Sequence, residues 1–316
     1  MREIFKEYLF RTPKLWPRFG LGTKIGCAIL LGTILMLPHY GYSQGLYGDP
    51  SETLGQWGKF KLEVGTGSTV NPNLKINNKP VSVTTVQGEF NLTASDTIVA
   101  IRTKQNFLTA TLGLGSSFDA LIKVGQFKAQ DGFDGNYSPS GGLGFRFSPP
   151  QTSHLKMGFL FQAFYATSEN DGFDTSVDTG FDTDSKGITR HIAASGTGKD
   201  KLRLIQYDGL LSLSIQDIAY VRPYGALLVS YQDRTEKGSF SGQGVLTTCV
   251  GISCISAPRQ VYLSWNTDVS SDTVVGGVFG LSMTPFEWVG INLEGFLGAG
   301  HLGTQYGYTV SAFVNF

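Results

Sequence analysis

The sequence predicts an all-β fold, namely a transmembrane, antiparallel, up-and-down β-barrel of about ten strands, with eight or twelve also possible. Three features predict it: a signal-like N-terminus, paired stretches in which apolar and polar side chains alternate, and a last strand that ends in Phe316. The composition agrees, because charged residues make up only 16% and Gly accounts for 41 of 316 residues. A soluble β-sandwich shares this composition, so the pattern along the chain has to distinguish the two.

Residues 1–43 are predicted to be a secretory signal peptide, which leaves residues 44–316 as the barrel domain. The apolar run from Ile25 to Leu37 is shorter than the roughly 20 residues that a spanning helix needs, and it leads to small residues and a cleavage site near Ser43. A retained anchor is the alternative, because the basic stretch before the run is long for a signal. That stretch contains Arg2, Lys6, Arg11, Lys14, Arg18 and Lys24.

The last strand shows the alternation most clearly. Its outward, apolar face is predicted to carry Tyr306, Tyr308, Val310, Ala312, Val314 and Phe316. Gly307, Thr309, Ser311 and Asn315 form the other face, which Phe313 interrupts. Strands of this kind cross a bilayer when they tilt and close on themselves, because every backbone N–H and C=O group then has a partner.

The same alternation recurs in pairs of segments that meet at short turns, predicted at 116–119, 149–153, 216–218 and 284–288. With a first strand around Phe60, Leu62 and Val64, the pairs give ten strands. An even number places both ends of the barrel on one side of the membrane. Five long connections are expected on the other side, at about 66–96, 128–141, 168–201, 232–272 and 298–303.

Aromatic residues are expected to form two rows at the membrane interfaces. The row near the short turns is predicted to contain Trp57, Trp288, Phe286, Tyr224 and Phe316, and the opposite row Tyr165, Tyr231, Trp265 and Tyr306. The alternative is that these side chains form the core of a soluble sandwich.

Two cysteines follow the predicted signal, and they lie close together. An exported chain with Cys249 and Cys254 in TTCVGISC favours a local disulfide that staples a loop. A pair of thiols is the alternative, and the pair makes a poor metal site because no histidine is near.

The terminal run YGYTVSAFVNF, with the signal and the paired strands, resembles bacterial outer-membrane β-barrel proteins. The resemblance extends to an uncharacterised porin-like group, on the segments ETLGQWGKFKLEVGTG and LGLGSSFDALIKVG. It implies a Gram-negative outer-membrane location and an assembly signal, read by the barrel assembly machinery, at Tyr308, Val310, Ala312, Val314 and Phe316. Long loops would then be extracellular and short turns periplasmic.

If the faces are assigned in this way, charged side chains of both signs point into the lumen. They either pair and fill the interior or line a narrow water path. The predicted lumen-lining residues are Lys61, Glu63, Lys123, Arg146, Lys156, Gln162, Asp208, Arg222 and Glu294.

No catalytic residue, cofactor or metal is expected. His154, His191 and His301 have no serine or acidic residue at a fixed catalytic spacing, so a barrel hydrolase is the least favoured hypothesis. Acidic turns recur at Asp131, Asp171 and Thr179, but their spacing fits solvated turns better than a calcium loop.

The sequence therefore leaves two main functions open: a narrow passive channel for small solutes, or a closed structural barrel with adhesive extracellular loops. Equal numbers of basic and acidic residues, 25 of each, exclude a nucleic-acid footprint. The expected partners are outer-membrane lipid and lipopolysaccharide, periplasmic chaperones and the assembly machinery, with the barrel itself a monomer.

Overall fold

The computed structural model describes residues 48–76, 81–85, 88–92, 97–130, 135–150, 154–178, 182–183, 187–216, 220–286, 288–301 and 303–316. The predicted signal peptide, residues 1–43, therefore lies outside the described residues. Within them no helix is long and apolar enough to cross a bilayer.

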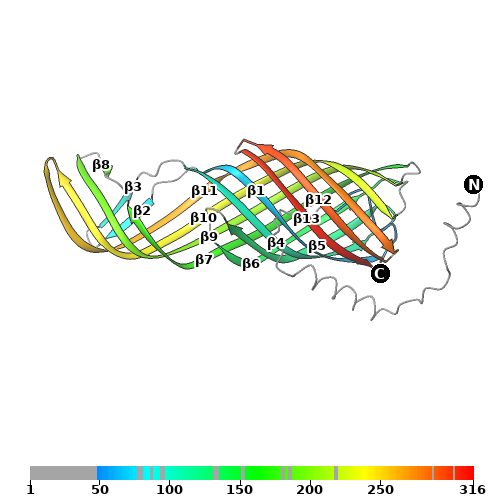
Figure 1. Ribbon diagram of the computed structural model, residues 1–316, viewed down its shortest axis with the longest axis horizontal. Coiled ribbons are helices and arrows are strands. Elements are labelled where there is room, and N and C mark those ends of the chain that lie inside the picture. Colours follow the sequence, from blue (N-terminus) through cyan, green and yellow to red (C-terminus); the bar gives the residue numbers. More distant parts are fainter. Residues whose placement is uncertain are drawn as a thin grey trace, which may run out of the picture.

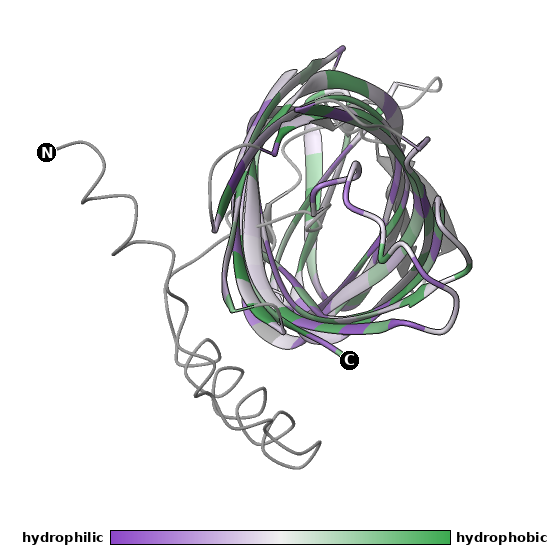
Figure 2. Cartoon of the chain, turned by 90° about the vertical axis from the view of Figure 1, so that its right-hand side faces the viewer, coloured by the Kyte–Doolittle hydropathy of each residue, from purple (hydrophilic) through white to green (hydrophobic). Residues whose placement is uncertain are grey.

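Ten antiparallel strands pair with their sequence neighbours and close into a ring (Figures 1 and 2). The ring closes where β1 pairs with β13, from Lys61 opposite Asn315 to Val70 opposite Tyr306. The closed ring leaves no unpaired sheet edge inside the lipid, where an unsatisfied backbone group is costly. The ten strands are β1 (Phe60–Ile76), β4 (Thr97–Gly113), β5 (Phe118–Gln130), β6 (Asn136–Phe147), β7 (Leu155–Asp178), β9 (Ile188–Ile215), β10 (Val221–Val250), β11 (Ser253–Phe286), β12 (Val289–Gly300) and β13 (Gly303–Asn315).

Alternation along the strands places apolar side chains outside the ring, and inside it polar and charged side chains together with an apolar cluster of Leu160, Leu210, Ala226, Leu228, Val278 and Phe296. On β5, Ile122 and Val124 are exposed outward while Lys123 between them is buried. On β9, Leu211 and Leu213 face outward and Ser212 is fully buried. The predicted faces of these strands are confirmed. Successive side chains of a strand point to opposite faces of the sheet, so residues two apart in the sequence share one face.

Three strands continue far beyond the length that a bilayer requires. β9, β10 and β11 have 28, 30 and 34 residues, whereas about 9–11 residues suffice for a tilted crossing. The prediction of long loops at 168–201 and 232–272 is therefore wrong in conformation for the residues that the structure describes. Residues 168–178 and 188–201 continue β7 and β9 as strands, and 232–272 continue β10 and β11 up to the turn at Gly251. The outer face of these segments is polar. They therefore lack the alternating apolar outward residues by which a membrane strand is predicted.

We call the part of the sheet beyond the membrane the extension, and define it as residues 168–178, 188–203 and 235–269 with β2 (Val81–Thr85) and β3 (Gly88–Leu92). β2 pairs with β11, so a hairpin from the β1–β4 connection widens the sheet, and the short β8 (Asp182–Thr183) pairs with β9. The extension has its own buried cluster of Ile192, Ala194, Phe240, Leu246, Val261 and Leu263. It forms the end of the molecule opposite the C-terminus (Figure 1).

Candidate functional site

The interior of the barrel contains the charged residues that alternation assigns to the lumen. Lys61, Glu63, Lys123, Asp208 and Glu294 are all at most 7% exposed. Arg146 is 2% exposed, and Lys156, Gln162 and Arg222 are half-buried nearer the rim or the wall. The interior is therefore not a wide aqueous lumen at these positions.

Most of these side chains have partners within the barrel. Lys61 Nζ lies 3.3 Å from Glu63 Oε2, and the Glu63 carboxylate also accepts hydrogen bonds from Asn292 at 2.7 Å and from Ser311 at 2.5 Å. These contacts join β1, β12 and β13 around one carboxylate. Buried charges are tolerated only when they are paired and hydrogen-bonded in this way.

Two further polar groups form hydrogen bonds on the inner wall of the barrel. The Asp208 carboxylate on β9 accepts hydrogen bonds from Gln162 on β7 at 2.8 Å and from Gln206 at 2.7 Å. The Tyr224 hydroxyl donates to Glu294. Lys123 lies 4.3 Å above the ring of Phe107, a cation–π contact that keeps the ammonium group in the wall.

A short segment before β1, residues 48–54, lies inside the barrel at the end where the C-terminus is found. Pro50 and Ser51 pass so close to β7 that a Cβ added at Gly158 would meet the Pro50 carbonyl oxygen at 2.2 Å. The Ser51 hydroxyl hydrogen-bonds to Ser214 on β9 at 2.6 Å, and the Leu54 amide donates to the Asp119 carboxylate on β5 at 3.0 Å. We call residues 48–54 the inner segment.

Two of the arginines predicted to line the lumen contact the inner segment. Arg146 donates to the carbonyl of Glu52 at 3.0 Å and lies 3.9 Å from Asp119, and Arg222 pairs with the Glu52 side chain. Sequence reasoning missed this segment because it has no periodicity. The available signal was its pair of acidic residues, Asp49 and Glu52, in a polar stretch that directly precedes the first strand.

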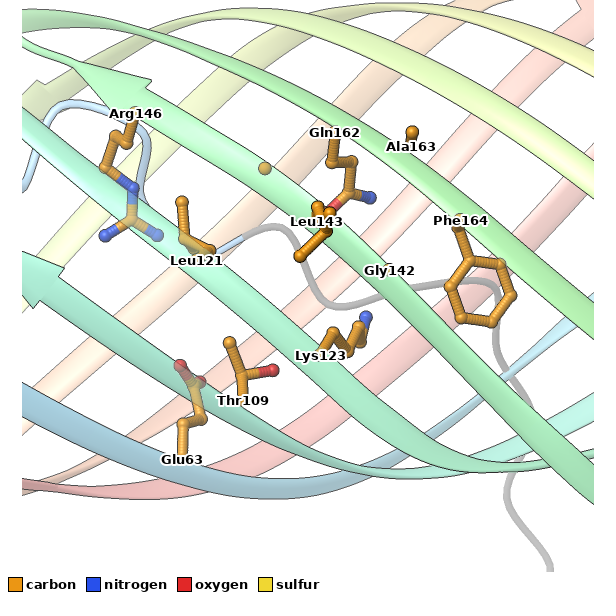
Figure 3. A pocket seen from close by; sticks show the side chains of 11 residues that line it. Glu63, Thr109, Leu121, Lys123, Gly142, Leu143, Arg146, Gln162, Ala163 and Phe164 are labelled. Carbon is orange, nitrogen blue, oxygen red and sulfur yellow. The ribbon is translucent and has the colours of Figure 1, made fainter.

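One cavity inside the middle of the barrel is small. A cavity of about 20 Å³ is lined by Glu63, Thr109, Leu121, Lys123, Arg146 and Gln162 among others (Figure 3). A volume of this size holds about one water molecule. A larger cavity of about 400 Å³ opens at the mouth beside the inner segment, against Lys59, Trp288 and Phe316.

The outer surface of the ring is apolar over the height of a bilayer. Leu227 and Phe279 are each 69% exposed, and other outward positions are occupied by leucine, valine and phenylalanine. Beyond this band lies a row of outward tyrosines, exposed by 41–48%: Tyr165, Tyr207, Tyr231, Tyr306 and Tyr308. Aromatic rows of this kind mark the interface between lipid and water. The chain is a transmembrane β-barrel of the outer-membrane type.

The barrel is similar to several solved structures. They include the outer membrane protease OmpT of Escherichia coli (11% identity, TM-score 0.40, covering 84% of this chain and 100% of that one) and the translocator domain of the autotransporter NalP of Neisseria meningitidis (10%, 0.36, 93% and 95%). A third is the attachment invasion locus protein Ail of Yersinia pestis (12%, 0.29, 83% and 100%). No protein-family model and no curated protein matches the sequence.

The predicted interface position of Tyr224 is wrong. Tyr224 is predicted in the aromatic row near the short turns, but it is only 5% exposed and points inward to Glu294. It shares the inward face of β10 with Ala226 and Leu228. The side chain of Trp265 lies outside the described residues. Trp57 and Phe286 are 77% and 44% exposed at the end that carries the short turns.

The cysteines and the C-terminal strand lie at opposite ends of the molecule. Cys249 and Cys254 face each other across the β10–β11 ladder and form a disulfide at the end of the extension. In the predicted assembly signal, Tyr308 is exposed, whereas Ala312 and Val314 are buried. Recognition of this strand by the assembly machinery stays a prediction.

One histidine acquires a partner that the sequence did not indicate. His301, in the turn between β12 and β13, places its ring Nδ1 3.2 Å from the Asp272 carboxylate, which also accepts the His301 backbone N–H at 3.0 Å. The two residues are distant in sequence, so spacing gave no sign of them. Of the acidic turns, Asp171 pairs with Lys199 at 3.6 Å, and the turns at Asp131 and Thr179 lie outside the described residues. Among the residues described, no cluster of His, Cys, Asp and Glu fits a metal ion.

Proposed function

We propose that this protein is a closed outer-membrane barrel whose working part is the extension, which contacts surfaces outside the cell. The observation that carries the proposal is that β9, β10 and β11 run about three times as far as a membrane crossing requires, and build a second core there. The sequence alone is compatible with this function and with that of a channel. No step of the proposal requires catalysis.

The filled interior supports the proposal. The inner segment is fixed by contacts to β5, β6, β7, β9 and β10, and the cavity in the middle of the barrel accommodates about one water. A solute would have to displace paired charges to pass, and breaking a buried pair costs several kcal/mol. The barrel thus acts as a rigid membrane anchor for the extension.

The test uses the refolded protein without its signal, and a variant in which Asn-Gly replaces residues 244–259. This replacement joins Gln243 to its register partner Gln260 through a turn suited to a hairpin. We expect no discrete conductance from either protein in planar bilayers. Bacteria that display the full protein should adhere to cell monolayers or matrix-coated wells, and those that display the variant should not.

Heat-modifiable gel migration of both proteins serves as the control that the barrel is folded. Discrete conductance by the full protein would overturn the proposal, as would equal adhesion by bacteria that display either protein.

A narrow channel is the second candidate, and one observation favours it. Both amide atoms of Gln105 and the Thr111 hydroxyl are buried on the inner face of β4 without a hydrogen-bond partner in the structure. Such atoms are ordinarily satisfied by water or by a polar solute. If this wall serves conduction, removing residues 44–54 should produce discrete conductance steps that Gln105→Leu reduces. An unchanged silent bilayer would exclude the channel.

A further inference from the structure

The turn between β10 and β11 is the far end of the extension, and its side chains are apolar. Val250 is 63% exposed, Ile252 103% and Ile255 75%. Gly251 has a φ of 60°, a left-handed conformation that glycine adopts without strain and that allows the tight turn. Turns in water ordinarily present polar residues, so three exposed aliphatic side chains at a free end indicate contact with an apolar phase.

Charge is absent from the whole end of this hairpin. Between Lys237 and Arg259 the sequence GSFSGQGVLTTCVGISCISAP contains no charged residue. A charged side chain within hydrocarbon costs about 2.5–3.5 kcal/mol or more, which selects against charge in segments that enter lipid. Below the end, Arg190 lies opposite Thr248 and Arg259 lies opposite Gly244. Cations at this depth would meet anionic headgroups.

The end of the hairpin is also held in a fixed shape. The Cys249–Cys254 disulfide joins register partners, and the hydroxyls of Thr247 and Ser256 hydrogen-bond to each other at 2.9 Å. Val250 pairs with Ile188 on β9 as well as with Ser253 on β11. Because the backbone of β10 is paired on both sides here, burial of this end leaves few backbone groups without partners, and little entropy is lost on binding.

We propose that the stapled end of the hairpin, Cys249–Cys254, is a membrane-insertion element that enters the headgroup boundary of a second bilayer facing the cell surface. The proposal rests on the proposed surface-contact function and names its partner as a lipid surface. The strand from Tyr231 to Val250 is about 60 Å long at ~3.3 Å per residue, so the end is held away from the protein's own membrane. Protein hot spots favour Trp, Tyr and Arg, which the end lacks.

Flotation with vesicles tests the proposal. The refolded protein in nanodiscs is mixed with protein-free vesicles of phosphatidylcholine and phosphatidylglycerol, and the fraction that floats with the vesicles is measured. Ile252→Asp and Ile255→Asp should each lower that fraction at least tenfold. Val245→Asp, on the same hairpin below the end and 43% exposed, is the matched control and should leave it unchanged.

A second measurement reports insertion directly. Ile252→Trp should show a blue-shifted emission when vesicles are added, and lipids brominated on their acyl chains and present only in those vesicles should quench it. Unchanged emission, or flotation that ignores Ile252→Asp, would overturn the proposal. Equal losses for Val245→Asp would overturn it too, because they would mean that binding is not confined to the end of the hairpin.

The two proposals fail in distinguishable ways. If replacement of residues 244–259 abolishes adhesion while vesicles are never bound, the surface-contact function stands and the partner is a protein or glycan. If the full protein conducts ions but still floats with vesicles in a manner that depends on Ile252, the insertion element stands and the closed-barrel function falls.

Discussion

The outward faces of β9, β10 and β11 differ in polarity between the membrane part of the barrel and the extension. Within the membrane β9 presents Leu211 and Leu213 outward and Asp208 and Ser212 inward. In the extension β9 presents Lys199 and Lys201 outward, and its inward positions carry Ile192, Ala194 and Leu202.

The reversal follows the medium. A strand exposes whatever its surroundings solvate, so lipid selects leucine on the outside and water selects lysine there. One continuous ladder thus joins an anchor, whose interior holds polar side chains beside apolar ones such as Leu210 and Leu228, to a sheet beyond the membrane with an apolar core. The change occurs near the outward tyrosines, Tyr207 and Tyr231, whose rings lie 6.3 Å apart.

The largest effect is expected from the core of the extension. Phe240 is 2% exposed, and Phe240→Ala should destabilise the extension by about 3–5 kcal/mol through lost burial and the cavity left behind. Limited proteolysis should then cut the extension rapidly, while the barrel keeps its heat-modifiable migration. Loss of that migration would show that the two halves fold as one unit.

Reversing the polarity of the lipid-facing surface is expected to have the next largest effect. Leu211→Arg places a cation against hydrocarbon and should cost about 2–4 kcal/mol in urea unfolding of the protein in lipid. Lys201→Leu, on the same strand but in water, should change the unfolding free energy by less than about 0.5 kcal/mol. Similar costs at both positions would contradict the placement of the membrane boundary.

A pH dependence is expected at the base of the extension. Burial, together with the nearby carboxylate of Glu236, raises the pKa of Asp200 from 3.8 to about 7. Between these values the folded extension holds a proton that the unfolded chain has released, so its stability should fall as pH rises from about 4 to 7. Proteolysis rates across this range should rise more steeply for the natural sequence than for Asp200→Asn. Parallel profiles would contradict the assignment.

The smallest effect is expected from an exposed ion pair. Lys201 lies 2.5 Å from Glu169, with both side chains about half exposed. Removing it by Glu169→Gln should cost less than about 1 kcal/mol, and the difference should vanish in high salt because water and ions screen the pair. A larger cost that persists in salt would mean that the pair is shielded from water.

Much of the membrane-spanning fold could be predicted from the sequence, because lipid imposes a strict two-residue period on every crossing. The number of strands, their faces and the inward position of residues such as Glu63 and Asp208 all follow from that period. What Glu63 contacts does not follow, since Asn292 and Ser311 lie far away in sequence and are brought near only by ring closure.

The remaining features had no periodic signal to reveal them. The inner segment forms no strand, and its position depends on single contacts to Asp119, Arg146 and Ser214. The extension does alternate, but with reversed polarity, so a search for apolar outer faces interpreted it as loops. The contact between His301 and Asp272 joins the β12–β13 turn to strand β11, and no local pattern relates the two residues.

Closure of the ring has a consequence for biogenesis. β1 begins at Phe60 and pairs with β13, whose partner residues extend to Asn315, so the first and last strands to leave the ribosome must find each other. The seam therefore cannot form until β13 has been synthesised. Until that moment β1 has a partner on its β4 side alone, and a delay in β13 leaves the wall open along β1.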